Sequence, residues 1–145
     1  MALWQFDCYI VPRKNGISAL NGEEILSWKR SDAFSVSIDF LEKQESWSKD
    51  IIQYGKDDET CIQFLYENGM LEEIHCRLDL RSLSKKMLEE ILKFVALIDG
   101  VIFCEDRFCP PNIDNVAEMM RKSNANKFCQ NPRQYFEEIS GGVNS

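Results

Sequence analysis

The stretch Thr60–Arg81, TCIQFLYENGMLEEIHCRLDLR, decides the fold, because two runs of alternating apolar residues flank an Asn-Gly pair. This pattern is typical of a β-hairpin. A two-residue turn at Asn68-Gly69 would set the apolar face of one strand against the polar face of the other. A three-residue loop, Glu67–Gly69, with its glycine in the left-handed region, shifts the pairing by one. We therefore predict this second register, with Phe64 and Ile74 on the buried face of the sheet.

The sequence on both sides of the hairpin predicts further strands and helices from its periodicity and its capping residues. The expected elements are a strand at Leu3–Val11, a short helix from Asn21 through Trp28, a helix over Leu83–Ile98 ended by Gly100, a strand at Val101–Glu105, a loop at Cys109–Pro111, and helices that begin at Asn112 and at Asn131-Pro132. Residues 32–54 remain open between strand and helix, because Val36, Ile38 and Phe40 alternate whereas Trp47, Ile51 and Tyr54 keep helical spacing.

These elements predict an α+β fold, in which an antiparallel sheet with a central hairpin (60–81) carries helices on one face. Their order is compatible with a ferredoxin-like core plus a C-terminal helical extension. A looser α+β sheet fits the same order. With 145 residues, we expect a single domain over residues 1–140 and a flexible tail at 141–145.

Composition indicates a soluble cytoplasmic protein. Hydrophobic residues make up 44% of the chain and charged residues 28%, which is ordinary for a globular domain. Residues 1–12 lack the basic stretch of a secretory signal, and Leu88–Ile98 is too short to cross a bilayer. Six cysteines in such a chain are expected to stay reduced.

The net charge of −7 is unevenly placed along the sequence. Residues 39–79 contain eleven acidic and four basic side chains, whereas the rest of the chain contains thirteen of each. An acidic field of this kind repels nucleic acid and anionic membranes and attracts basic partners. We therefore expect a protein partner with a basic surface and neither nucleic acid nor membrane.

Candidate catalytic chemistry is limited to one pair of residues. In the predicted register His75 lies opposite Cys61, and a thiol beside an imidazole is the minimum for nucleophilic catalysis. Nothing in the sequence marks a third group that would orient the base, or an oxyanion site. A surface histidine beside a half-buried cysteine is the simpler interpretation.

Polar residues of the hairpin and of the turn before it are the candidate partner-binding residues. Arginine is favoured at protein interfaces, so Arg77 is the expected anchor. The full candidate set is Asp57, Asp58, Glu59, Glu73, His75, Arg77, Asp79 and Arg81.

The sequence predicts no cofactor and no metal. It contains no P-loop, dinucleotide-binding fingerprint, HExxH or GxSxG motif. The spacing of Cys104 and Cys109 is wider than that of paired zinc ligands. Residues 56–59 lack the alternating oxygen ligands and the central glycine of an EF-hand loop.

Two stretches resemble a known group of proteins. One is Ser123–Phe128 followed by Asn131-Pro132 and Tyr135–Ile139; the other is Trp47, Tyr54-Gly55, the acidic turn and the Arg77-x-Asp79-x-Arg81 strand. Over residues 45–140 they resemble small bacterial cytoplasmic α+β proteins of the kind that act as immunity proteins beside polymorphic toxins. The resemblance implies tight binding to a toxin domain and carries over no individual site residue.

Taken together, the sequence predicts a non-enzymatic protein-binding module, in the form of an immunity protein that neutralises a toxin domain. Two alternatives remain: a small cysteine-dependent enzyme that uses Cys61 and His75, and a regulatory domain that binds a small ligand between sheet and helices. The identity of the partner and the oligomeric state are left open.

Overall fold

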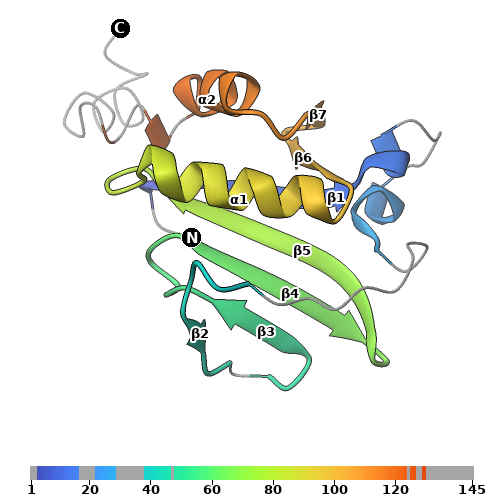
Figure 1. The fold of residues 1–145 in the computed structure, drawn as a ribbon. Coiled ribbons are helices and arrows are strands. Elements are labelled where there is room, and N and C mark those ends of the chain that lie inside the picture. The colour runs from blue at the N-terminus through green and yellow to red at the C-terminus, as the bar shows by residue number, and fades with distance from the viewer. Residues whose placement is uncertain are drawn as a thin grey trace, which may run out of the picture.

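The computed structural model describes residues 3–16, 22–28, 38–46, 48–123, 125, 126 and 129, which form an α+β fold around a seven-stranded antiparallel sheet (Figure 1). The strand order across the sheet is β2-β3-β4-β5-β1-β6-β7. The elements along the chain are β1 (Gln5–Pro12), the 3-10 turns η1 (Arg13–Gly16) and η2 (Gly22–Leu26), β2 (Lys43–Gln44), β3 (Ile51–Tyr54), β4 (Cys61–Glu67), β5 (Met70–Asp79), α1 (Lys85–Leu97), β6 (Gly100–Cys104), β7 (Arg107–Cys109) and α2 (Ile113–Arg121).

The centre of the sheet contains a split β–α–β unit. Both β5 and β6 run antiparallel to β1, so they run parallel to each other with β1 between them and α1 as their connection. A ferredoxin-like fold needs a second crossover of this kind. The described residues between β1 and β2 contain only 3-10 turns and bends. The fold class α+β is confirmed, whereas the ferredoxin-like core is not.

The central hairpin has the predicted faces but a different register. Glu67 pairs with Met70, and Asn68 and Gly69 have φ of 53° and 78°, so the loop has two residues rather than three. The pairing then shifts between Leu65 and Tyr66, which leaves one extra residue on β5. The predicted three-residue loop is wrong. The bulge, and not the loop, brings the apolar side chains of both strands to the same face of the sheet.

That extra residue is Glu72, which lies between the pairs Tyr66–Leu71 and Leu65–Glu73. Its backbone carbonyl accepts a hydrogen bond from the backbone N–H of Trp28 at 2.9 Å. Beyond the bulge Phe64 pairs with Ile74, and both are fully buried, as predicted. The bulge therefore gives the backbone at Glu72 a partner outside the sheet.

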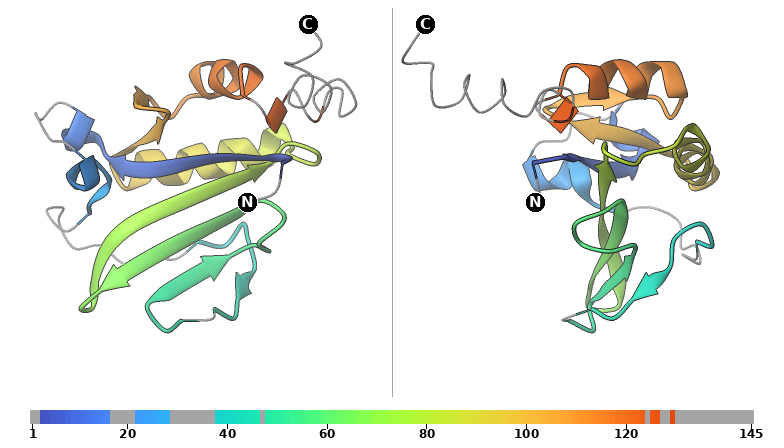
Figure 2. Two further views of the ribbon diagram at one scale, coloured as in Figure 1. Left: turned by 180° about the vertical axis from the view of Figure 1, so that it is seen from behind. Right: turned by 90° about the vertical axis from the view of Figure 1, so that its left-hand side faces the viewer.

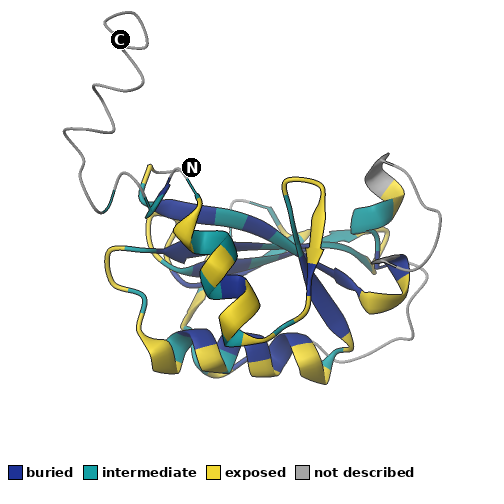
Figure 3. Ribbon diagram, turned by 90° about the horizontal axis from the view of Figure 1, so that it is seen from above, coloured by how far each residue is buried: buried dark blue, intermediate teal, exposed yellow. Residues whose placement is uncertain are grey.

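The hydrophobic core lies between the sheet and α1. One face of the four central strands packs against the helix, and Figure 3 shows α1 with exposed residues outward and buried residues toward the sheet. The main buried residues from the sheet and the helix are Phe6, Cys8, Ile10, Ile62, Phe64, Ile74, Cys76, Leu78, Ile102, Leu88, Ile91, Leu92, Phe94 and Val95. Figure 2 shows that α1 lies on one side of the sheet while the 3-10 turns lie at the end of β1.

The predicted helix over Leu83–Ile98 is confirmed with slightly shorter bounds. Ser84 is its N-cap, because its side-chain oxygen accepts from the backbone N–H of Met87 at 3.0 Å. At the other end Asp99 takes the left-handed conformation, with φ of 55°. Gly100, which we expected to end the helix, instead begins β6; a Cβ there would lie 3.2 Å from a methyl of Ile10.

The remaining predicted helices and strands are confirmed only in part. The helix capped by Asn112 is confirmed as α2, which lies beside α1 (Figure 1). The described parts of residues 32–54 contain strands β2 and β3 and no helix, and β7 lies where no strand was predicted. Asn21, residues 32–37, Trp47, the helix expected from Asn131-Pro132 and the tail 141–145 lie outside the described residues. Among the described residues, no helix is long and apolar enough to span a membrane.

Candidate functional site

The sheet face away from α1 carries a continuous row of side chains, one from each strand. Each member lies directly opposite the next in the pairing of the seven strands. We call this set the cross-strand row; its members, in sheet order, are Gln44, Gln53, Gln63, His75, Tyr9, Phe103 and Phe108. One half consists of amides and the other of rings, so the face changes from polar to aromatic across the sheet.

Direct contacts fix several members of this row. The amide of Gln63 donates to the side-chain oxygen of Gln53 at 2.8 Å. The rings of Tyr9 and His75 stack with centroids 4.8 Å apart, and those of Phe103 and Phe108 lie 4.9 Å apart. Such pairs limit the motion of the rings. These contacts hold the members of the row in fixed positions, although Gln53 is itself buried.

His75 is bonded to a carboxylate that the sequence did not single out. Its Nε2 donates to Oδ1 of Asp7, and their side chains are 16% and 34% exposed. Asp7 belongs to the face of β1 that also carries Tyr9. Alternation along β1 puts Asp7 on the polar face, but only the pairing of β1 with β5 brings it to His75.

The prediction that Cys61 lies opposite His75 is wrong. Because of the bulge, the register moves by two residues, so His75 lies opposite Gln63 and Cys61 lies opposite Arg77. Cys61 is 1% exposed, and burial raises the pKa of its thiol to about 11, although the Arg77 charge opposes that rise. A thiol in this state is protonated at neutral pH and is a poor nucleophile.

The remaining hairpin candidates divide into two groups. Glu73 and Arg77 are half-buried on the face of the cross-strand row, and no described atom bonds the buried Nε of Arg77. Asp79 is 2% exposed and Arg81 forms two hydrogen bonds to its carboxylate, each 3.0 Å long. Burial alone would raise the pKa of Asp79, but the bonds from Arg81 outweigh burial and lower it.

Arg81 also organises the acidic turn that precedes β4. Its guanidinium lies 3.9 Å from the centre of the Trp4 ring, and its Nη2 donates to the carbonyl of Asp58 at 3.2 Å. The indole N–H of Trp4 donates to the same carbonyl at 2.7 Å. Arg81 therefore connects the buried carboxylate of Asp79 with the acidic turn, while its own side chain is 46% exposed.

The acidic turn, Asp57–Glu59, is held by its backbone. The side-chain amide of Gln5 donates to the carbonyls of Asp57 and Glu59 at 2.8 and 2.6 Å. With the bonds to Asp58, all three carbonyls have side-chain partners, which come from the start of β1, from Trp4 just before it, and from Arg81 just after β5. The three acidic residues are exposed.

The acidic segment of the sequence forms one half of the sheet. Residues 39–79 contain β2, β3, β4 and β5, which lie at the side of the molecule away from α2 (Figure 1). Eight of its eleven acidic residues are exposed. The excess of acidic residues in one segment of the sequence is therefore also an excess of negative charge on one side of the molecule.

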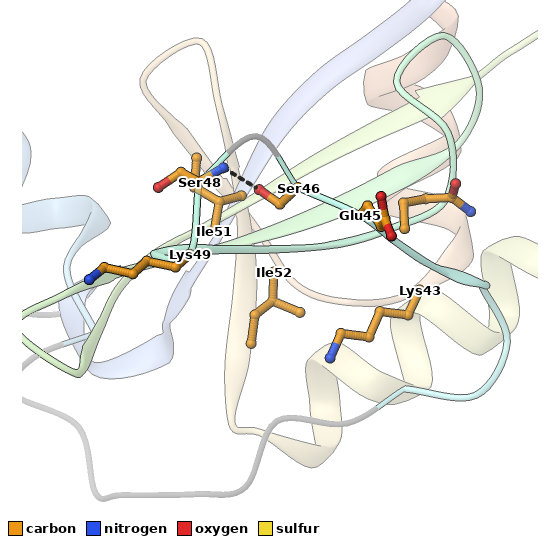
Figure 4. A pocket seen from close by; sticks show the side chains of 8 residues that line it. Lys43, Glu45, Ser46, Ser48, Lys49, Ile51 and Ile52 are labelled. Atoms are coloured by element: carbon orange, nitrogen blue, oxygen red, sulfur yellow. Dashed lines mark hydrogen bonds between the residues drawn. The ribbon is translucent and has the colours of Figure 1, made fainter.

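Surface hollows lined by described residues accompany these features. One, of about 540 Å³, lies at the β2–β3 hairpin, where Lys43, Ser46, Lys49 and Ile52 line it (Figure 4). A second, of about 400 Å³, lies between β1 and the β6–β7 turn. A third, of about 290 Å³, lies between the acidic turn and the start of α1.

The described residues do not bring the candidate catalytic groups together. Within that part of the chain, no three His, Cys, Asp or Glu side chains converge as metal ligands. The Cys61 thiol is buried, and the His75 imidazole is engaged by Asp7 and Tyr9. Comparison with models of protein families, with curated proteins and with solved structures found no match for this chain.

Proposed function

We propose that this chain is a non-enzymatic protein-binding module whose acidic half binds a basic surface on a partner protein. One observation carries the proposal: the acidic turn Asp57–Glu59 has every backbone carbonyl bonded by side chains from other elements, while its own residues are exposed. A turn built in this way holds its negative charges in a fixed place on the surface.

The fixed turn has two consequences for binding. A segment that is already ordered loses less conformational entropy when a partner binds, so more of the interaction energy remains as affinity. An excess of charges of one sign on one half of a molecule also steers an oppositely charged partner and raises the association rate. Both effects favour a fast-binding protein partner with a basic face.

Within this class, we propose the role of an immunity protein that neutralises a toxin domain. The proposal rests on the resemblance of residues 45–140 to small immunity-type proteins, together with the acidic half of the sheet. An acidic module of this kind would cover a basic region of the toxin. Glu73, His75 and Arg77 lie on the neighbouring face and would extend the contact beyond the acidic turn.

The cellular test is co-expression with the toxin reading frame that this role places beside the gene. The wild-type chain should restore growth to cells that produce the toxin domain. A gene neighbourhood without such a reading frame contradicts the immunity role. So does a toxin whose effect the chain leaves unchanged.

The surface test is a charge reversal measured as an association rate. The variant Asp58→Lys with Glu59→Lys should associate about tenfold more slowly with the partner at low salt, and the difference should shrink as salt shortens the screening length to about 10 Å at 0.1 M. Asp57 is left intact because its carboxylate accepts from Gln53 at 2.7 Å.

The matched control carries the same change of charge in the other half of the molecule. Glu89→Lys with Glu118→Lys alters two exposed positions on α1 and α2. This control should associate nearly as fast as wild type. Equal rates for both variants at every salt concentration would show that the acidic turn is not part of the interface.

A further inference from the structure

The second hollow lies at an opening inside the sheet. β6 pairs with β1 over Tyr9–Pro12, and then turns away into the β6–β7 hairpin. The first half of β1, from Gln5 to Cys8, has β5 on one side and a pocket of about 400 Å³ on the other. We call this the β1–β6 pocket. Its volume falls within the usual range for pockets that bind small molecules.

Two aromatic members of the cross-strand row are among the residues that line this pocket. Tyr9 and Phe103 lie opposite each other on β1 and β6, and both belong to the lining. His75 stacks on Tyr9, and Phe108 packs against Phe103. The ring of each of these two residues is thus held by a ring from the next strand. Fixed aromatic faces are suited to a flat or cationic group.

The charged residues of the lining are all acidic. Asp7 comes from β1, and Glu105 and Asp106 form the β6–β7 turn; no lysine or arginine is among the described lining residues. Burial, and then the charges of Glu105 and Asp7, raise the pKa of the Cys104 thiol to about 11. The exposed carboxylates of Glu105 and Asp106 therefore give the rim of the pocket a negative charge, while the Asp7 carboxylate is bonded to His75.

We propose that the β1–β6 pocket binds an arginine side chain of the protein partner. A guanidinium is planar, so it can stack on the Tyr9 or Phe103 ring while its N–H groups pair with a carboxylate. A lysine ammonium lacks this flat face and is more strongly hydrated. The inference rests on the proposed function, because it assigns one anchoring residue to the basic partner.

The experiment uses the full chain and a small probe, so it needs no knowledge of the partner. N-acetyl-arginine amide is titrated to about 100 mM, because a single side chain in a partly exposed site is expected to bind with a Kd on the order of 10 mM. The readout is the aromatic NMR signals of Tyr9 and Phe103. N-acetyl-citrulline amide, which has the same shape without the charge, is the ligand control.

We expect saturable shifts of both rings with the arginine probe and at least about tenfold weaker binding of the citrulline probe. The variant Glu105→Gln with Asp106→Asn should weaken arginine binding about fivefold, since it removes two partly exposed ion pairs. Asn tolerates the left-handed conformation of position 106, where φ is 62°. Asp58→Asn with Glu59→Gln removes two charges elsewhere and should leave the Kd unchanged.

Three results would overturn the proposal: no shift at the highest concentration, equal shifts with both probes, or an equal loss of affinity in both variants. These results are independent of the acidic turn. If charge reversal at Asp58 and Glu59 leaves partner association unchanged while the arginine probe still shifts Tyr9 and Phe103, the proposed binding surface fails and the pocket assignment stands.

Discussion

Cys61 should be among the least reactive thiols in the folded protein. Burial raises its pKa from the ordinary 9.0 to about 11. This difference lowers the fraction of thiolate at neutral pH about 100-fold relative to an accessible cysteine, and the thiolate is the reactive form. Because the residue is also only 1% exposed, the reagent has little direct access to it.

The assay is timed alkylation with iodoacetamide at neutral pH, followed by mass spectrometry of the peptide that contains Cys61. The rate constant in the folded protein should be at least about 100-fold below that of the same peptide in urea. His75→Ala should leave the rate unchanged, because His75 lies opposite Gln63 rather than Cys61. The rate in His75→Ala distinguishes a thiol that is only buried from a thiol that the imidazole activates.

Two outcomes would refute this reasoning. Alkylation of folded Cys61 as fast as that of the unfolded peptide would mean that burial does not control its pKa. A rate that falls when His75 is removed would mean that the imidazole activates the thiol. Either result would restore the cysteine-dependent enzyme as a candidate function.

Three further predictions concern stability. Phe64→Ala should lower the free energy of unfolding by about 3–5 kcal/mol, because Phe64 is fully buried; urea denaturation should show a much smaller loss for Leu65→Ala on the opposite face. Gly55→Ala should cost about 1–3 kcal/mol in the same assay, because φ is 84° and its Cβ would lie 2.1 Å from a carbonyl oxygen. The pKa of Asp79 is lowered below its usual 3.8, so its stabilisation is present above that pH and is lost as pH falls through the folded pKa. The stability difference between wild type and Asp79→Asn should therefore be larger at pH 7 than at pH 3.

The hairpin shows how much of the fold the sequence could predict. Alternation around Asn68-Gly69 identified both strands and their buried faces, because burial of one face constrains the parity of the register. It could not identify the bulge at Glu72. That bulge has its backbone carbonyl bonded to Trp28, and no local pattern shows that these two segments meet. The predicted pairing of β4 with β5 therefore put the correct side chains on each face of the sheet, but beyond the bulge it paired each residue two positions away from its observed partner.

The candidate site shows a similar limit. The sequence placed Arg77 and His75 on the polar face, but it gave no strand order, so Asp7 and Tyr9 could not be connected with His75. The strand β7 was missed because it has three residues and follows a turn, Glu105-Asp106, that contains no glycine. Without β7 and the strand order, neither the cross-strand row nor the β1–β6 pocket could be recognised.

The central place of β1 has a consequence for how the chain folds during synthesis. Its partners β5 and β6 both follow it in the sequence, beyond β4 and α1 respectively. During synthesis β1 therefore stays unpaired until residues 70–104 have left the ribosome. Until then its apolar residues Phe6, Cys8 and Ile10 are uncovered. Pairing between distant segments is slow, and exposed apolar strands attract chaperones or other nascent chains. Refolding of the intact chain should accordingly be limited by the insertion of β1 between its two neighbours.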